Sequence, residues 1–445
     1  MAAGGFSGDK RTTRSSAINA GAVTTRSKAK KSDRKNHLKH QLVTLIETTI
    51  SSAHSFLSLN DLHLLPSQTL ALESFIYSTS SSLQALSPCL PKLSLHPPPR
   101  QCWFQRFLSA TAEVDCDPRW NLFFRMSKSS FSLLLRLLSP IQSCSSTSVP
   151  PDCALAAALF RLAHGASYKA VGRRFGIDSA DACRSFYAVC KAINDKLGHL
   201  LELRSDIDRI VVGFGWISLP NCCGVLGLRR FGVEGDLLGK DGSLLVQALV
   251  DAEGRFLDVS AGWPSSMKPE TILRQSKLYA EIEKSGELLK GPVYNLDDGK
   301  PISQYLIGDS CFPLLPWLLT PYMKLNEEDS SGFPERAFNS THNRAMGLVN
   351  TAFCKVRARW KLLSKPWKEE CRDFFPFIVL TGCLLHNFLI KCSEKLVEEQ
   401  DEDDGASCSS EEQKFPLYDG ETGDDRGKDI RDALALHLSR LSFRR

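Results

Sequence analysis

The sequence predicts an α/β protein in which an all-helical N-terminal region precedes a domain built around a sheet. Three observations carry this prediction. Apolar residues recur with helical spacing between residues 37 and 140, three short helices separated by glycine-containing turns follow, and runs rich in Val, Leu, Ile and Phe begin beyond residue 206. The chain has 445 residues, of which 42% are hydrophobic and 24% are charged, so it has the composition of a globular protein of two or three domains.

Residues 1–36 predict a disordered basic arm, because they are rich in Ser, Thr, Ala, Gly, Lys and Arg and hold few apolar side chains. A dense basic cluster in this segment is typical of a nuclear import signal, and a merely solvated tail is the alternative. We therefore expect the protein to enter the nucleus. The cluster consists of Arg26, Lys28, Lys30, Lys31, Arg34 and Lys35.

Two helical regions follow this arm. The first covers residues 37–145 and is interrupted by a proline-rich break at 88–99. The second, residues 150–200, has helical segments at Cys153–His164, Tyr168–Phe175 and Ala180–Leu197, with Ser167 and Ser179 as expected N-caps of the last two.

This spacing is that of a helix-turn-helix, all-helical and placed before the sheet. The last helix has Asp181 near its start, where the charge would repel phosphates, and the basic residues lie on the preceding helix instead. Two alternatives remain, a DNA reader and a helical bundle that only packs. The possible DNA contacts are Lys169, Arg173 and Arg174.

The 15 cysteines include no CxxC pair, so we expect reduced intracellular thiols and no structural zinc site. The apolar stretch Phe374–Ile390 is short and is interrupted by Pro376, His386 and Asn387. It predicts a buried helix and no membrane segment.

Residues 206–395 predict the α/β domain. Val-, Leu-, Ile- and Phe-rich runs indicate a meander of strands, and a short strand leads into Gly308 and Asp309. Beyond it, residues 396–428 predict an acidic disordered linker and 429–445 a C-terminal helix. The predicted strands are Cys222–Val233, Ser243–Asp251, Arg255–Ala261 and Gln304–Ile307, and the predicted helices are Thr271–Leu289 and Asn339–Trp360.

Ordered motifs across residues 150–395 resemble those of the PIF/Harbinger transposases of the DDE superfamily, and most of all the domesticated plant Harbinger transposon-derived proteins. The resemblance implies an RNase H-like transposase core in which three acids, D-D-E, hold Mg²⁺ for phosphodiester chemistry. The motifs are Tyr305–Ser310, Ser243–Asp251 with Gly262–Pro264, Phe338–Trp360, and Leu384–Asn387.

Carried over residue by residue, the resemblance retains only the second acid, Asp309. The first-acid position falls on Gly227 and the third on Asn350, and Pro269 stands where a further acid usually follows the strand motif. Arg229 beside the first position would repel a metal or pair with Asp309. We therefore expect no catalysis and no bound metal, so Mg²⁺ is lost as a cofactor. The other acids weighed as substitutes are Glu234, Asp236, Asp251, Asp258 and Glu335, and the second nearby arginine is Arg230.

The resemblance also implies partners. Harbinger elements encode a separate Myb/SANT-like protein that the transposase binds. Domesticated plant relatives sit in chromatin-regulating complexes, including Polycomb-linked and anti-silencing histone acetyltransferase assemblies. The leading hypothesis is a nuclear non-catalytic adaptor that contacts DNA indirectly. The alternatives are a divalent-metal-dependent nuclease with an altered site and a DNA-binding module acting through the helix-turn-helix.

Overall fold

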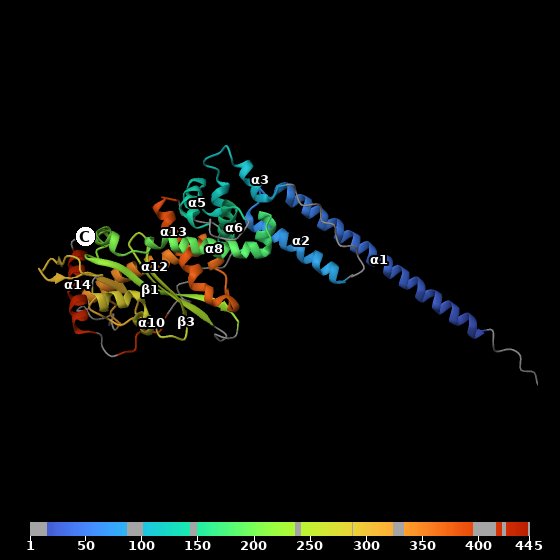
Figure 1. Cartoon of the computed structure of the whole chain (residues 1–445). Helices are drawn as coiled ribbons and strands as arrows, with labels where there is room; N and C mark the ends of the chain where they lie inside the picture. Colours follow the sequence, from blue (N-terminus) through green and yellow to red (C-terminus); the bar gives the residue numbers. More distant parts are fainter. Residues whose placement is uncertain are drawn as a thin grey trace, which may run out of the picture. The chain divides into compact units, whose positions relative to one another are not determined.

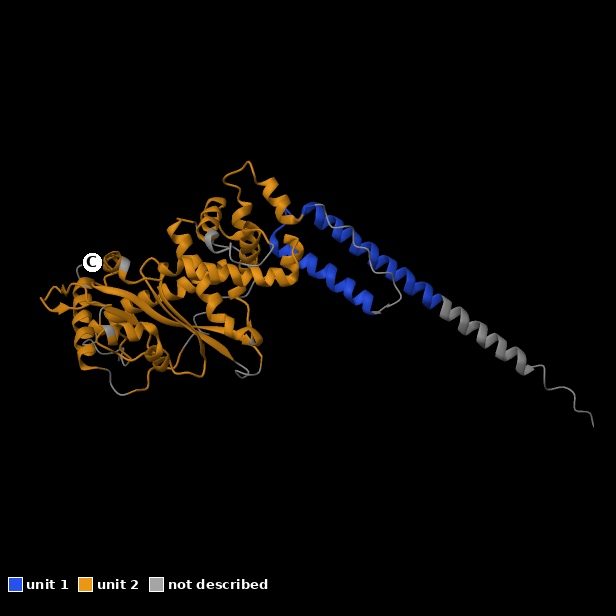
Figure 2. Ribbon diagram, viewed as in Figure 1, with its two compact units in different colours: residues 1–101 blue, residues 102–445 orange. Residues whose placement is uncertain are grey.

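The computed structural model describes residues 16–86, 101–142, 149–235, 242–286, 288–323, 333–394, 415–420 and 424–443. The chain forms two compact units, unit 1 from Met1 to Gln101 and unit 2 from Cys102 to Arg445 (Figure 2).

Unit 1 consists of two packed helices, α1 (Ser16–Asn60) and α2 (Pro66–Leu86). The start of α1 at Ser16 differs from the expectation of a disordered arm through residue 36. This segment is rich in Ala, Lys and Arg, which are strong helix formers, so the helix of the apolar region continues toward the N-terminus.

Unit 2 begins with α3 (Trp103–Ala110), α4 (Arg119–Phe124), α5 (Lys128–Gln142), α6 (Pro151–His164), α7 (Tyr168–Phe175) and α8 (Ser179–Leu197). The region 37–145 is therefore not one domain. The Trp103 ring contacts those of Phe123, Phe160 and Phe175, so the helices from residue 103 onward pack with α6 and α7 in unit 2.

A mixed sheet forms the centre of unit 2 (Figure 1). After α9 (Ile207–Trp216), three antiparallel strands follow in a meander, β1 (Cys222–Glu234), β2 (Ser243–Val250) and β3 (Phe256–Pro264). Strands β6 (Tyr305–Gly308) and β7 (Leu318–Leu319) add parallel to the other side of β1, giving the order β3-β2-β1-β6-β7. The strand predictions are confirmed to within a few residues.

The helices that cover the sheet are α10 (Pro269–Gln275), α11 (Lys277–Ala280), α12 (Phe333–Arg359), α13 (Phe375–Lys391) and α14 (Asp425–Phe443). The single helix predicted at Thr271–Leu289 is wrong. The chain turns extended at Ser276, whose Oγ accepts from the backbone N–H of Tyr279 and starts a new helix, which continues as a π-helical turn (Glu281–Ser285). Smaller elements are β4 (Tyr294–Asn295), β5 (Pro301–Ile302), β8 (Trp367–Lys368) and 3₁₀ turns at 198–200, 204–206, 361–363 and 369–374.

Helix α13 is the core helix predicted from its polar interruptions. Within the described chain one stretch, Glu370–Lys391, is long and apolar enough to cross a membrane by composition, and 67% of its most apolar 18-residue window is buried inside the protein. Eleven described cysteines are free thiols, whereas Cys354 is disulfide-bonded, contrary to the expectation that all are reduced.

Part of the segment predicted as an acidic linker lies against the core. The backbone N–H of Tyr418 donates to the Ser310 carbonyl at 3.0 Å, and Asp419 forms a 3.2 Å ion pair with Lys268. Helix α14 then begins at Asp425, earlier than predicted, and packs along α12. Apolar residues at helical spacing explain this packing, since Leu434 and Leu438 are buried.

Candidate functional site

The structure brings Asp309 and Gly227 to neighbouring strands. Strands β1 and β6 run parallel with Leu226 opposite Gly308, and the backbone N–H of Asp309 donates to the Leu226 carbonyl at 3.3 Å. The half-buried Asp309 follows the carboxyl end of β6, where its Oδ1 accepts from the Ser310 hydroxyl at 3.0 Å. The positions that the transposase resemblance assigns to the first two acids are therefore adjacent.

The space that a first acid would need is filled by α12. A Cβ on Gly227 would lie 3.0 Å from Val349 Cγ1 and 3.5 Å from Met346 Cε, and Val349 is buried. A gap of 3.0 Å is tighter than ordinary contact between carbon atoms. Any larger side chain at Gly227 therefore requires the side chains of Val349 and Met346 to shift.

Asn350 occupies the next position of α12 and is exposed. The turn that carries the expected third-acid position thus lies over β1, and Val349 makes the contact with Gly227. An amide at this position is neutral, so it offers a metal no charge.

Two residues along β1 from Gly227, Arg229 points to the same face and is buried. Burial, and then the nearby charge of Arg357, lower the pKa of Arg229 to about 10, while the charge of Asp309 opposes this shift. Within the described residues, Arg229 and Asp309 form no ion pair. Arg230 lies on the opposite face, with its guanidinium 4.5 Å from the centre of the Phe415 ring.

Asp251 fastens the turn between β2 and β3. Its Oδ1 accepts from the backbone N–H groups of Glu253 and Arg255 at 2.9 and 2.8 Å, and its Oδ2 accepts from Arg255 Nε at 2.7 Å. Burial raises the pKa of Asp251, and the hydrogen bonds and charge of Arg255 oppose that shift. Asp251 thus acts as a structural clamp.

Asp258 lies on the other face of the sheet. Asp258 pairs with Leu249, and Gly227 pairs with Ala248, the residue next to Leu249 on β2. Because neighbouring residues of a strand point to opposite faces, Asp258 and Gly227 lie on opposite faces of the sheet. The side chain of Leu249 lies on the face of Gly224, 2.6 Å from a Cβ built on that glycine. Burial and then the charge of Glu281 raise the pKa of Asp258 to about 6.

The remaining acids that the structure describes also lie away from Asp309. Glu234 is exposed at the end of β1, and Asp236 falls outside the described residues. Glu335 is in the first turn of α12, about 22 Å along the helix axis from Asn350. Pro269 is the first residue of α10.

These residues do not fit a pair of Mg²⁺ ions. Such a pair needs several charged oxygen ligands in strict geometry. Here Asp309 is the one carboxylate at the assigned positions, Val349 fills the space beside Gly227, and the buried Arg229 adds positive charge. Across the described ranges, no group of three His, Cys, Asp or Glu side chains is arranged to hold a metal.

The histidine and asparagine residues of the transposase-like motifs bind backbone. His342 Nε2 lies 2.8 Å from the Gly308 carbonyl and His386 Nε2 lies 3.0 Å from that of Gly254. Asn387 accepts from the N–H of Phe256 and donates to the carbonyls of Phe256 and Leu200, so it joins α13 to β3.

Both histidines are held neutral by their surroundings. Burial lowers the pKa of His342, and it lowers the pKa of His386 to about 4, while the hydrogen bonds to backbone oppose these shifts. The motifs singled out these residues but did not predict that their side chains join helices to strands through hydrogen bonds to the backbone. The strongly apolar neighbours of His386 and Asn387 in the sequence were the available signal for those two residues, whereas the neighbours of His342 are polar.

The prediction that Arg174 could contact DNA is wrong. Its side chain is buried, with its guanidinium carbon 5.0 Å from the Trp103 ring centre and 4.9 Å from that of Phe160. Lys169 and Arg173 are exposed on the same helix, α7. The N-cap of α8 is Asp178 in place of the expected Ser179, and its carboxylate accepts from the Asp181 N–H at 2.6 Å, whereas Ser167 caps α7 as predicted.

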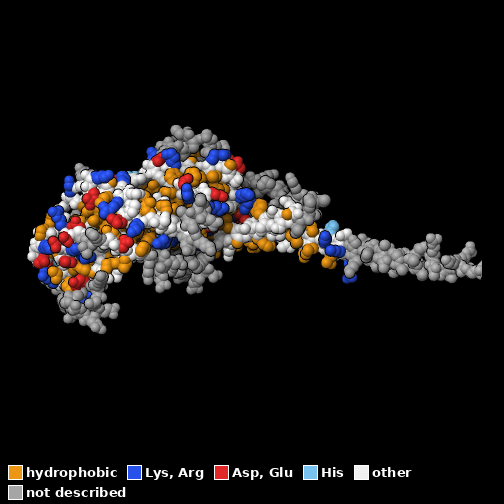
Figure 3. Space-filling model, turned by 90° about the horizontal axis from the view of Figure 1, so that it is seen from below, with side chains coloured by type: hydrophobic (Ala, Val, Ile, Leu, Met, Phe, Trp, Pro, Cys, Tyr) orange, Lys and Arg blue, Asp and Glu red, His pale blue; other side chains and the backbone are white. Residues whose placement is uncertain are grey.

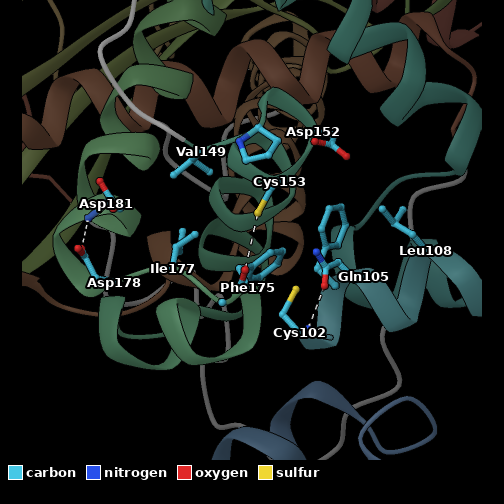
Figure 4. Close-up of a pocket in the computed structure, with 13 residues that line it drawn as sticks. Cys102, Gln105, Leu108, Val149, Asp152, Cys153, Phe175, Ile177, Asp178 and Asp181 are labelled. Carbon is cyan, nitrogen blue, oxygen red and sulfur yellow. Dashed lines mark hydrogen bonds between the residues drawn. The ribbon is translucent and has the colours of Figure 1, made fainter. Parts of the chain in front are cut away.

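A cavity of about 440 Å³ lies between α3, α6, α7 and the start of α8 (Figure 4). Phe175 and Ile177 line it together with three carboxylates, those of Asp152, Asp178 and Asp181, and its described lining includes no Lys or Arg. Carboxylates repel the phosphates that dominate DNA affinity. The surface around the start of α8 is therefore poorly suited to the major groove.

The basic cluster falls on α1. Arg34 and Lys35 are exposed, and the side chains of Arg26, Lys28, Lys30 and Lys31 lie outside the described residues.

Comparisons with known proteins agree with this geometry. A family model of DDE superfamily endonucleases matches residues 239–387. The Arabidopsis thaliana protein ALP1-like is 30% identical over 321 residues, which cover 67% of this chain and 77% of that protein.

A second Arabidopsis thaliana protein, Antagonist of Like Heterochromatin Protein 1, is 29% identical over 363 residues, covering 75% of this chain and 87% of that protein. No solved structure matches the chain. The chain therefore belongs to the DDE superfamily endonucleases, within the Harbinger-derived group of domesticated transposases that includes the ALP1-like proteins.

Proposed function

We propose that this protein is a nuclear adaptor that has kept the fold of a Harbinger transposase and lost its chemistry. It joins a chromatin-regulating complex, either an anti-silencing histone acetyltransferase or a Polycomb-linked assembly, and binds a Myb/SANT-like partner. Its contact with DNA is then indirect.

The sheet supports the architectural part of this proposal. Three antiparallel strands followed by two strands parallel to the first, in the order β3-β2-β1-β6-β7, form the arrangement of an RNase H-like core. Asp309 lies at the carboxyl edge of this sheet, where an open α/β sheet places its ligands.

The proposed loss of catalytic activity rests mainly on one observation, the packing of Val349 against Gly227. A missing acid alone leaves an empty position that another group or a water could occupy. Here the buried Val349 occupies that space, with its Cγ1 3.0 Å from a Cβ built on Gly227. The site is therefore packed as tightly as a hydrophobic core.

Two further observations support the adaptor reading. One relative is named as an antagonist of a heterochromatin protein, which is consistent with a chromatin role for this chain. The cavity beside α8 is lined by apolar side chains and three carboxylates, and both suit a protein partner better than a phosphate backbone.

The experiment is affinity purification of the tagged full-length chain from nuclease-treated nuclear extract, followed by mass spectrometry. We expect a SANT-domain protein together with chromatin-modifying subunits, and equal recovery with Asp309→Ala. A matched assay incubates the purified chain with supercoiled plasmid and MgCl₂ or MnCl₂. Cleavage by the wild-type chain that Asp309→Ala abolishes would overturn the proposal in favour of a nuclease.

A further inference from the structure

The described residues of unit 1 form a small apolar core. The hydrophobic cluster between α1 and α2 consists of Ile50, Leu57 and Ile76, with Ile46, Ala53, Leu64 and Leu72 packed against it. A pair of helices with so little buried apolar surface needs further support, from a metal, a disulfide or association with another chain.

A second apolar stripe of α1 remains exposed. Five large side chains along it are between 49% and 79% exposed, where a solvent-facing helix normally carries charge. They are Leu38, Leu42, Leu45, Phe56 and Leu59, and Figure 3 shows hydrophobic side chains gathered along the described part of unit 1.

The spacing of this stripe is that of a coiled-coil seam. Its members follow one another in alternating steps of four and three residues, with Thr49 and Ser52 filling the two middle positions. At about 100° per residue, the stripe is turned roughly a third of a circle from the face that Ile50 and Leu57 present to α2. Helix α1 therefore has two separate apolar faces, and one of them has a partner within unit 1.

The chain offers no charge by which this stripe would select a different protein. Between residues 40 and 60 the one Lys, Arg, Asp or Glu is Glu47, which lies about half a turn away from the stripe. Helix α2 likewise carries one such residue, Glu73. An uncharged seam with a regular heptad spacing is complementary to itself, as a two-fold interface requires.

We propose that the exposed stripe of α1 binds the same stripe of a second copy of this chain, so that two α1–α2 hairpins form a four-helix bundle. The two α1 helices run antiparallel. A parallel pair would bring together the basic segments at residues 26–39 of both copies, and their repulsion would weaken the dimer. The inference concerns unit 1 alone and stands whether or not the core has lost its chemistry.

The test is the mass of the full-length chain by light scattering during gel filtration, with analytical ultracentrifugation for affinity. We expect a dimer at micromolar concentration, and Leu42→Glu/Leu45→Glu should weaken it at least about tenfold, because it buries carboxylates in the seam without partners. The variant should still fold, since both leucines are exposed in the single chain.

The control is Thr44→Glu/Ser51→Glu, which adds the same charge to exposed positions on the polar side of α1. It should leave the dimer unchanged. A wild-type chain that is monomeric at these concentrations would overturn the proposal. So would a dimer that survives Leu42→Glu/Leu45→Glu, because its contact would then lie elsewhere.

Discussion

Placing an acid back at the first position should fail to restore catalysis and should destabilise the fold. In Gly227→Asp, the new Cβ lies 3.0 Å from Val349 Cγ1 and 3.5 Å from Met346 Cε, inside a strand that is paired on both sides. Overpacking of this kind costs roughly 1–3 kcal/mol. Adding Asn350→Glu should not produce divalent-ion-dependent nicking of supercoiled plasmid, because Val349 and Arg229 still occupy the site.

A double-mutant cycle in urea isolates the packing from the charge. Gly227→Ala should lower the free energy of unfolding by about 1–2 kcal/mol, since overpacking outweighs the smaller gain from removing a strand glycine. Combining it with Val349→Ala should recover part of this loss, with a coupling of at least about 0.5 kcal/mol. Gly347→Ala is the matched control, because a Cβ there meets nothing within 4 Å and the helix gains up to about 1 kcal/mol.

The outcome that refutes this reasoning is clear. If Gly227→Asp/Asn350→Glu folds with wild-type stability and cuts DNA in Mg²⁺ or Mn²⁺, then α12 yields easily and the site has lost only its acids.

Three further predictions follow from buried groups. Arg174→Ala should lower the free energy of unfolding by about 2 kcal/mol, because it removes a desolvated guanidinium from two aromatic rings, whereas Arg173→Ala should stay within about 0.5 kcal/mol in the same urea titration. Asn387→Ala should cost about 2–4 kcal/mol by leaving backbone groups of β3 unpaired, which thermal unfolding would show. His386 has a folded pKa of about 4, below its unfolded value, so the unfolded chain binds more protons and stability falls as pH drops below about 6.5. At pH 5 the loss is about 2 kcal/mol, and denaturant titrations at several pH values should show a flatter profile in His386→Gln but an unchanged one in His199→Gln, since His199 is exposed.

The sequence predicted the strands and most helices because their signals are local. Long runs of Val, Leu and Ile indicate β1 and β2 wherever they lie in the fold, and a serine followed by a helical pattern indicates the start of α7. The break at Ser276 and the packing of Tyr418 against Ser310 depend on contacts that a window of sequence does not contain. The same limit explains the wrong prediction for Arg174. Its local sequence indicates an exposed cation, but Trp103, which is distant in sequence, packs against its guanidinium.

The candidate site shows the same difference between features that depend on local sequence and features that depend on long-range contacts. Motif spacing indicated that Gly227 and Asn350 replace acids, because that comparison needs only residue identities. That Val349 packs over Gly227 could not be predicted, since it depends on the register of α12 against β1.

The motif residues of this chain therefore fall into two sets, those that stabilise the fold and those at the positions that the resemblance assigns to catalytic acids. Those that persist, such as His342, His386 and Asn387, bind backbone carbonyl or amide groups and hold strands and helices together. Removing them would cost stability in any protein with this fold, whether or not it cuts DNA. At the positions that the resemblance assigns to acids, Gly227 has no side chain to make such a contact, and Val349 packs over it. Resemblance in the first set is thus informative about the fold, and only the second set is informative about catalysis.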